Sequence, residues 1–377
     1  MGRCKFCNKE NKLISKVLET CRKCLLELDW NKVKEHLVSV HARVRKAEGL
    51  PPSAPKALSD ESIYHCNLCI NKCNFAIGDL SYCGLRTRGN KYDNISVPPT
   101  RFTAYMHGYL DNNPTNCCNA WFCPAGTSNG FPTFSTIKGP EYGTLSYAAF
   151  LYGCSFNCLF CQNQSHKHPS ILSVKNVNEL ALEIVENEDI SCICYFGGTP
   201  EPQLPFTINL SKKILELMES NNKKRIIRSC WEWNGTGKRQ LVEKCMKIAI
   251  KTGGNIKFDL KAYNEKLNIA LCGVTNTKTL NNFRFLAETY FGTRGKDMPE
   301  LSACTLLVPG YVNHEEVDLI ASFIASINDE IPYSILIFHP DYQMMDLPIT
   351  PRSQVEKCLK TAQHHLKNVH IGNKFLL

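Results

Sequence analysis

The chain has 377 residues, of which 43% are hydrophobic and 21% charged, and its net charge is +9 at pH 7. This balance excludes a disordered chain, and no apolar run approaches the ~18 residues that a membrane-spanning helix needs. The 21 cysteines, in a long chain whose first residues form no apolar signal core, argue against an extracellular disulfide scaffold and favour metal-bound thiolates in a reducing compartment. We therefore expect a cytoplasmic protein.

Residues 1–50 are predicted to form a small metal-binding module followed by one helix. Two Cys-x2-Cys pairs separated by 13 residues supply four soft ligands. These ligands are Cys4, Cys7, Cys21 and Cys24. Four such ligands with no open position predict a structural Zn²⁺ site of the zinc-ribbon type, with a rubredoxin-type iron site as the alternative. Asp29 can cap the start of the helix, and Gly49 can end it.

The N-terminal part of the chain is also basic, because residues 1–60 hold 13 Lys or Arg against 7 Asp or Glu. A small basic module can bind RNA or an acidic protein. A charged, solvated surface explains an excess of this size more simply. A nucleic-acid partner therefore stays open.

Residues 51–145 are predicted to be a Cys-rich, loop-rich region that begins with a linker at residues 50–55. Four of its cysteines have the tight spacing of metal ligands: Cys66, Cys69, Cys73 and Cys83. They predict a site for zinc or for an auxiliary iron–sulfur cluster. Cys117, Cys118 and Cys123 follow no spacing rule. A further cluster, a redox-active pair, a substrate-reactive thiol and a structural role all stay open for them.

From about residue 146, short apolar runs alternate with amphipathic stretches, a pattern that indicates βαβ units and a parallel sheet. The predicted strands are residues 145–152, 192–196, 225–229, 256–260, 301–308 and 334–338. The predicted helices lie near residues 176–188, 207–221, 237–252, 277–290, 314–327 and 351–367. Six strands are too few for a closed eight-stranded barrel. Residues 146–377 are therefore predicted to fold as an α/β, partial (β/α)6 TIM-type barrel, with its chemistry at the carboxyl ends of the strands.

Three cysteines follow the first predicted barrel strand in a Cys-x3-Cys-x2-Cys pattern: Cys154, Cys158 and Cys161. Three thiolates from one tight loop can bind three irons of a [4Fe–4S] cubane and leave the fourth iron open to a substrate. A zinc knuckle or a chance spacing is the simpler alternative in so Cys-rich a chain. The position of the pattern at the end of a strand favours the cluster.

A second motif, Gly197-Gly198-Thr199-Pro200-Glu201-Pro202, follows the second predicted strand. Alone it could be only a turn, but its small residues would let the backbone approach a ligand closely. Seven other cysteines are scattered along the barrel region and are expected to be small buried side chains. These are Cys192, Cys194, Cys230, Cys245, Cys272, Cys304 and Cys358.

Residues 64–377 resemble the pyruvate formate-lyase activating enzyme group of the radical S-adenosylmethionine (SAM) superfamily, and most closely its AmmeMemoRadiSam branch. The matching segments are residues 66–86, 153–163, 197–202, 234–235, 258–262, 271–273, 307–310, 338–342, 345–351 and 371–373. The resemblance implies a [4Fe–4S] cluster at Cys154, Cys158 and Cys161 that binds and cleaves SAM. The four cysteines at residues 66–83 match a segment of the family pattern, whereas typical relatives lack Cys117, Cys118 and Cys123, and the N-terminal module is an addition to the family core.

The resemblance also implies SAM contacts. Phe160 would lie against the adenine, and the backbone from Gly197 to Glu201 would hold the amino group. Asp259 and Lys261 match a SAM-contacting barrel motif, and His339 matches a histidine near the ribose or adenine. From the residues alone, a surface salt bridge and a core histidine are the simpler interpretations.

One position departs from the family pattern. Activating enzymes usually carry an acidic residue and then Thr-Asn-Gly, where the acidic residue helps to hold a monovalent cation. Here Glu232 is followed by Trp233-Asn234-Gly235, so the tryptophan replaces the threonine and puts the cation role in question.

These observations predict an enzyme that cleaves SAM reductively and uses the 5′-deoxyadenosyl radical to abstract hydrogen from a protein or another macromolecule. Its expected partners are SAM and a ferredoxin or flavodoxin-like electron donor. Activation of a glycyl radical enzyme and radical-based RNA modification are the alternatives. A zinc-ribbon binding protein with a relic barrel is a rival from another class.

Overall fold

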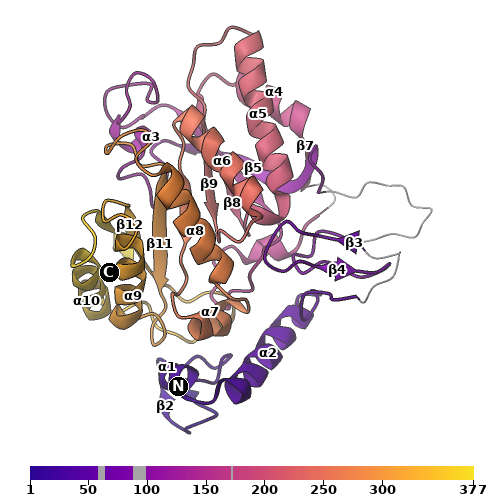
Figure 1. Ribbon diagram of the computed structural model, residues 1–377, viewed down its shortest axis with the longest axis vertical. Helices are drawn as coiled ribbons and strands as arrows, with labels where there is room; N and C mark the ends of the chain where they lie inside the picture. The colour runs from indigo at the N-terminus through magenta and orange to yellow at the C-terminus, as the bar shows by residue number, and fades with distance from the viewer. Residues whose placement is uncertain (58–63, 88–98, 171–172) are drawn as a thin grey trace.

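A central sheet of nine strands organises the computed structural model, which describes residues 1–57, 64–87, 99–170 and 173–377 (Figure 1). The order of the sheet is β13-β12-β11-β10-β9-β8-β6-β5-β7, so it stays open between β13 and β7. Its strands are β5 (Thr103–Asn112), β6 (Leu145–Leu151), β7 (Val174–Asn176), β8 (Ile190–Gly197), β9 (Arg228–Trp233), β10 (Ile256–Asp259), β11 (Leu301–Leu307), β12 (Tyr333–Ile337) and β13 (Val369–Gly372).

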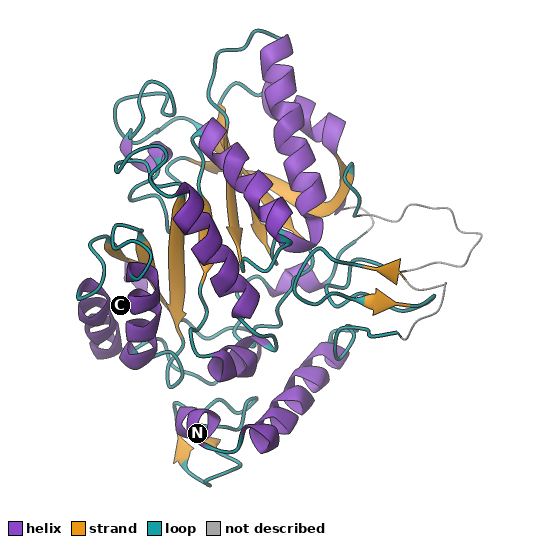
Figure 2. Cartoon of the chain, viewed as in Figure 1, coloured by secondary structure: helices purple, strands orange, loops and turns teal. Residues whose placement is uncertain are grey.

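Helices follow the parallel strands and pack along the outside of the sheet (Figure 2). They are α4 (Val177–Glu186), α5 (Leu204–Ser220), α6 (Arg239–Thr252), α7 (Glu265–Cys272), α8 (Thr277–Tyr290), α9 (His314–Ala325) and α10 (Arg352–Gln363). The short α3 (Pro124–Thr127) lies in the region before β6. None of the helices that the structure describes is long and apolar enough to cross a membrane.

The predicted α/β partial barrel is confirmed: all six predicted strands are present, in order and parallel to their neighbours. The prediction missed three strands of the sheet, β5, β7 and β13, and the short helix α7. β13 adds a seventh parallel strand, which is only four residues long and carries too little pattern to be recognised. β5 pairs antiparallel with β6, although its mixed polar sequence had predicted a loop. β9 also begins three residues later than predicted.

The N-terminal module packs on the barrel and shares its hydrophobic core. It comprises β1 (Gly2–Arg3), β2 (Glu10–Asn11), α1 (Arg22–Glu27) and α2 (Trp30–Ala47). The predicted helix α2 is confirmed, since the Asp29 carboxylate caps it by accepting from two backbone N–H groups. Apolar residues spaced three and four apart lie on one face of α2, and this face is buried in the main core cluster. These residues are Val33, Leu37, Val40 and Val44.

A second anchor of the module is polar. The backbone N–H of Ser15 donates to the Tyr311 hydroxyl at 2.9 Å, and that hydroxyl donates to Thr20 O at 3.0 Å. Gly310 lies against Leu13, whose carbonyl oxygen would be 2.1 Å from a Cβ at that position. Close packing therefore explains the glycine that follows Pro309.

A small hairpin lies beside the barrel between the module and the sheet. Its strands are β3 (Tyr64–His65) and β4 (Asn74–Phe75), and its loop carries the cysteine-rich segment between them. The Arg45 side chain of α2 donates to Tyr82 O at 2.5 Å and stacks on the Tyr82 ring. The module is thus connected to the hairpin region as well as to the barrel (Figure 1).

A buried ion pair fixes the segment between β5 and β6. The Arg228 guanidinium, at the start of β9, donates to both carboxylate oxygens of Glu141, and both side chains are almost fully buried. Burial raises the pKa of Glu141, but the hydrogen bonds and charge of Arg228 outweigh this effect and hold the pKa at about 2. Such a bidentate pair orients a loop that has little regular structure of its own.

Replacing Leu37 by Ala should lower the free energy of unfolding by about 2–5 kcal/mol, because a fully buried side chain between the module and the barrel is lost. The neighbouring change Val38→Ala is the control, since Val38 is 55% exposed. Urea denaturation of both variants measures the difference. Equal stabilities would contradict the shared core.

Replacing Glu141 by Gln should cost about 3–5 kcal/mol at pH 7, because Arg228 is left buried without its counter-charge. The pKa of Glu141 is lower in the folded chain, so its contribution is present above the unfolded pKa of about 4.3 and is lost as the pH falls towards about 2. The stability gap between wild type and variant, measured by denaturation across pH, should therefore shrink only at acidic pH. A gap that stays constant down to about pH 2 would contradict the ion pair.

Candidate functional site

The loop after β6 presents the three candidate cluster ligands to one cavity. Cys154, Cys158 and Cys161 all line this cavity, whose volume is about 180 Å³. Because β6 is one of the parallel strands, the loop lies at the carboxyl end of the sheet, where partial barrels place their chemistry. Phe160 is 4% exposed and lines the same cavity.

The backbone of this loop is paired with the end of α7. Asn157 N donates to Cys272 O at 2.8 Å, and Leu159 N donates to Leu271 O at 3.0 Å. The Cys158 and Cys272 sulfur atoms are 3.4 Å apart. Residues 271–273, which the sequence showed only as a matching segment, therefore support the cluster loop.

The side chain of Asn157 links the loop to the N-terminal module. Its Nδ2 contacts His41 Nδ1 at 2.9 Å, and its Oδ1 accepts from Lys167 Nζ at 3.0 Å. His41 Nε2 contacts Ala270 O at 3.0 Å; since a carbonyl only accepts, Nε2 carries the proton and Nδ1 accepts from Asn157. Burial lowers the pKa of His41 to about 4, so the ring is neutral at pH 7.

The sulfur of Cys154 accepts two N–H contacts, as cluster thiolates commonly do. Phe156 N and Asn234 Nδ2 each lie 3.4 Å from it. Burial raises the pKa of the free Cys154 thiol far above its ordinary value. A bound metal would reverse this effect, because a coordinating thiol is deprotonated. Asn234, from the matching segment 234–235, is thus positioned to stabilise a thiolate.

The segment after β8 packs directly on the cluster loop. Gly198 N donates to Leu151 O at 2.9 Å, and Thr199 N donates to Gly153 O at 3.2 Å. A Cβ on Gly197 would lie 2.6 Å from Leu151 O, and one on Gly198 would lie 2.3 Å from Gly153 O. The two glycines are therefore required for packing against this loop, in addition to any approach to a ligand.

The rest of that segment points away from the cavity. Thr199, Pro200 and Glu201 are buried and do not line the cavity, whereas Gly197 and Gly198 do. The Thr199 hydroxyl donates to Glu201, and the Glu201 carboxylate accepts from Thr236 N at 2.8 Å. These side chains hold the loop after β9 in place. Burial raises the pKa of Glu201.

Two predicted residues, Asp259 and Lys261, do lie in the cavity and form an ion pair at 2.7 Å. Burial raises the pKa of Asp259, but the charges of Lys257 and Lys261 outweigh this effect and hold that pKa well below its usual value. Lys257 also pairs with Glu232 at 2.7 Å. The pairing occupies the Glu232 carboxylate and counts against a separate cation there.

His339 also lies apart from the cavity, as do Thr199, Pro200 and Glu201. It follows β12, is half-buried, and is not among the residues that line the cavity. Its Nδ1 lies 3.3 Å from Pro340 O. The structure therefore brings together the three cysteines, Phe160, the two glycines and the Asp259–Lys261 pair, and leaves His339 outside.

The cavity fits a cofactor with polar groups. His166, which is 4% exposed, lines the cavity, and its Nδ1 has no hydrogen-bond partner within the described part of the chain. Buried polar atoms are rarely left without a partner. Three thiols and an unsatisfied imidazole nitrogen beside a charged pair form a donor set that suits an iron–sulfur cluster with a polar ligand such as SAM.

A larger cavity of about 800 Å³ adjoins the first, and Glu232 and Lys257 line both. Cys117, Cys118 and Cys194 line the larger one, and Cys117 Sγ lies 3.0 Å from Glu232 Oε1. Cys304 lies 2.8 Å from Asp259. Cys194, Cys304 and Cys272 thus contact the site, although scattered cysteines had been expected to be only small buried side chains.

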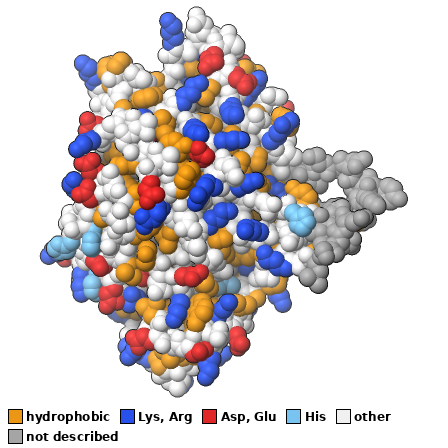
Figure 3. All heavy atoms as spheres, in the orientation of Figure 1, with side chains coloured by type: hydrophobic (Ala, Val, Ile, Leu, Met, Phe, Trp, Pro, Cys, Tyr) orange, Lys and Arg blue, Asp and Glu red, His pale blue; other side chains and the backbone are white. Residues whose placement is uncertain are grey.

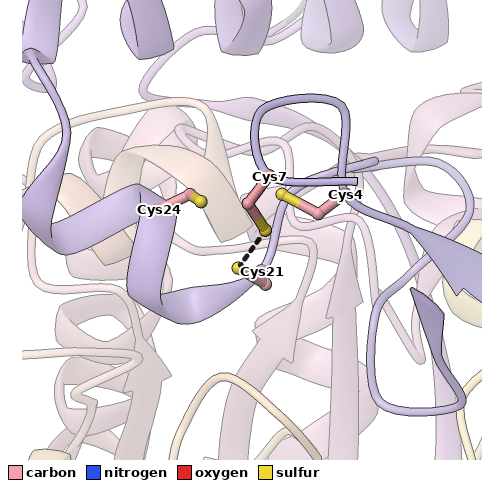
Figure 4. A group of neighbouring side chains, drawn as sticks. All are labelled: Cys4, Cys7, Cys21 and Cys24. Atoms are coloured by element: carbon pink, nitrogen blue, oxygen red, sulfur yellow. Dashed lines mark hydrogen bonds between the residues drawn. The ribbon is translucent and has the colours of Figure 1, made fainter. Parts of the chain in front are cut away.

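The four N-terminal cysteines converge on one point (Figure 4). Their sulfur atoms all lie within 4.8 Å of one another, and Cys7 and Cys21 are 3.8 Å apart. Tetrahedral zinc with Zn–S bonds of about 2.3 Å needs sulfur atoms about 3.8 Å apart. The geometry therefore suits a single metal ion.

Acidic and basic side chains are mixed on the face of the module seen in Figure 3, where no basic patch gathers.

Comparisons with known proteins match the barrel region of the chain. The family model of the radical SAM superfamily matches residues 149–324, which include the cluster loop. A Methanocaldococcus jannaschii protein, named as a candidate glycyl-radical enzyme activating enzyme, is 24% identical over 226 residues, 59% of this chain and 79% of that protein. Pyruvate formate-lyase 1-activating enzyme of Escherichia coli is 24% identical over 169 residues, 43% of this chain and 63% of that enzyme.

Among solved structures, the chain is similar to a domain of pyruvate-formate lyase-activating enzyme from Bacteroides vulgatus. It is 17% identical and covers 44% of this chain and 94% of that domain, with a TM-score of 0.34. A likeness this distant says nothing about ligands.

Replacing Cys7 by Ser should remove about one zinc ion per chain, because three thiolates and a hydroxyl hold zinc more weakly than four thiolates. Metal analysis by mass spectrometry measures the loss, with Lys9→Ser, an exposed neighbour, as the control. An unchanged zinc content in the Cys7 variant, or iron in its place, would contradict a zinc site.

Proposed function

Because the chain is a radical SAM enzyme similar to the pyruvate formate-lyase activating enzymes, we propose that it cleaves SAM reductively and abstracts hydrogen from a protein substrate. The observation that carries the proposal is the convergence of Cys154, Cys158 and Cys161 on a cavity that Asp259 and Lys261 share. When bound there, a [4Fe–4S] cluster would supply the electron that breaks a carbon–sulfur bond of SAM and yields the 5′-deoxyadenosyl radical.

The residues of this chain would bind and orient the reactants. The three thiolates would hold three irons, and the backbone of Gly197 and Gly198 would face the SAM amino group. The Asp259–Lys261 pair is largely removed from water, where charges act strongly on a bound polar ligand. Phe160 would cover the adenine. Thr199 and Glu201 would support the loop after β9 rather than touch SAM.

The larger cavity would receive the substrate. It adjoins the SAM cavity at Phe196, Glu232 and Lys257, so a group bound there lies next to the site of radical formation. Its lining combines the aromatic rings of Tyr109 and Trp121 with charged and amide groups. Such a mixture suits a segment of polypeptide, whose backbone needs hydrogen bonds while its side chains need apolar contacts.

Activation of a glycyl radical enzyme is the specific reaction that the names of the relatives favour. In that case the substrate segment would be a loop of the partner enzyme, and the electron would come from a ferredoxin or flavodoxin-like donor. Three cysteines, Cys117, Cys118 and Cys194, line the larger cavity in addition to the cluster ligands, and they would contact the same substrate segment.

Replacing Cys158 by Ala should abolish the formation of 5′-deoxyadenosine from SAM in dithionite-reduced protein, because the cluster loses one of its three ligands. Cys358→Ala is the matched control, since Cys358 is buried in α10 and outside both cavities. Liquid chromatography of the product measures both. Continued cleavage in the Cys158 variant would overturn the site assignment.

A further inference from the structure

The four cysteines of the hairpin region lie together beside the cluster loop. Cys66, Cys69 and Cys73 are buried in the segment between β3 and β4, and Cys83 follows nearby in the chain. Cys66 N donates to Cys73 O at 2.9 Å, and both residues belong to one buried cluster with Tyr82, which directly precedes Cys83 in the chain. They form a group distinct from the three ligands of the proposed SAM cluster.

The spacing of this group differs from that of the N-terminal one. Among the described residues, the N-terminal four are the only set of three or more metal-ligating side chains with ligand atoms within 4.8 Å of one another. Neither the thiols at Cys66, Cys69, Cys73 and Cys83 nor those at Cys154, Cys158 and Cys161 form such a set. A cubane binds each thiolate through a different iron, so it needs wider spacing than a single zinc ion.

The surroundings of the group suit an anionic cluster. Tyr82 N lies 3.4 Å from Cys73 Sγ, and Ser81 Oγ lies 3.3 Å from Cys83 Sγ, so donors are directed at the sulfur atoms. Arg86 N donates to Ser81 Oγ at 3.0 Å, so the Arg86 guanidinium is carried by the segment that holds Cys83. One nitrogen of that guanidinium, Nη1, is buried and has no partner among the described residues. Positive charge and free donors favour a bound anion.

The group is joined to both loops of the SAM site. The Asn71 side chain, 9% exposed, donates to Ser155 O at 2.9 Å and lies 3.8 Å from Cys69 Sγ. Ser155 follows Cys154 directly in the chain. Arg86 Nη2 donates to Pro202 O at 2.6 Å, so the segment after β8 is held as well. A short path of bonds therefore runs from Cys69 through Asn71 to the ligand loop.

We propose that Cys66, Cys69, Cys73 and Cys83 bind a second iron–sulfur cluster, and that Asn71 connects it to the SAM cluster for electron transfer. This inference rests on the proposed function, because it needs a cluster at Cys154. In each transfer, one electron from a reduced flavodoxin or ferredoxin-type protein reduces the upstream cluster. The same electron then reduces the SAM cluster and leaves the upstream cluster oxidised. Only an electron passes between the two clusters, and no bond is formed or broken.

The metal content of the full-length protein tests the site. After anaerobic reconstitution with iron and sulfide, the wild type should hold about eight irons per chain, and the double variant Cys66→Ser, Cys69→Ser about four. The control variant Cys245→Ala, at a buried cysteine outside both groups, should keep about eight. Loss of zinc instead of iron in the double variant would overturn the proposal and leave a structural zinc site.

The variant Asn71→Leu tests the connection without removing a ligand. Freeze-quench electron paramagnetic resonance after mixing with reduced flavodoxin should show the SAM cluster being reduced about tenfold more slowly, although both clusters are retained. Asn67→Leu is the matched control, because Asn67 is an exposed residue of the same segment. Equal rates in the two variants would overturn the role of Asn71.

The two proposals fail in different ways. If iron partitions as expected but dithionite-reduced wild type forms no 5′-deoxyadenosine, the proposed function fails and the second cluster stands. If SAM is cleaved but the iron content does not depend on Cys66 and Cys69, the second cluster fails and the proposed function stands.

Discussion

The hydrogen bonds that immobilise the loop from Cys154 to Cys161 are the constraint on which the rest of the site depends. Three thiolates can hold a cubane only if their loop keeps one conformation, and this loop has no regular secondary structure of its own. Its backbone is therefore bonded to the end of α7, and Asn157 is bonded to His41 and Lys167. The N-terminal module and the hairpin region both reach this loop from outside the barrel.

The ionised side chains at the boundary of the two cavities are also held in place by one another. Every second residue of β10 and of the loop after it, from Lys257 through Asp259 to Lys261, points to the same face of the sheet. On that face Lys257 pairs with Glu232 of β9 and with Asp259, and Lys261 pairs with Asp259. Buried charges are tolerated only as pairs, and the network leaves each carboxylate beside an ammonium group. A preorganised set of charges at the boundary of two cavities can bind a polar ligand without large rearrangement.

The sequence predicted the barrel well because strand and helix periods are local properties. The cluster loop, the glycines and the Asp259–Lys261 pair could be found from motifs that are short and continuous. The positions of Cys194, Cys272 and Cys304 could not, since contacts between distant strands and helices bring these residues to the site. Thr199 and Glu201 were also beyond reach, because a motif does not reveal that its side chains bond to Thr236 rather than face the cavity.

The central claim is that SAM binds directly to a cluster held by Cys154, Cys158 and Cys161. Electron–nuclear double resonance of the reduced, reconstituted protein with SAM labelled with ¹⁷O in its carboxylate tests this claim most directly. The account predicts a hyperfine coupling between the label and the cluster, because the iron without a cysteine ligand would bind the amino acid end of SAM. A sample with a full cluster and bound SAM that shows no such coupling would contradict it.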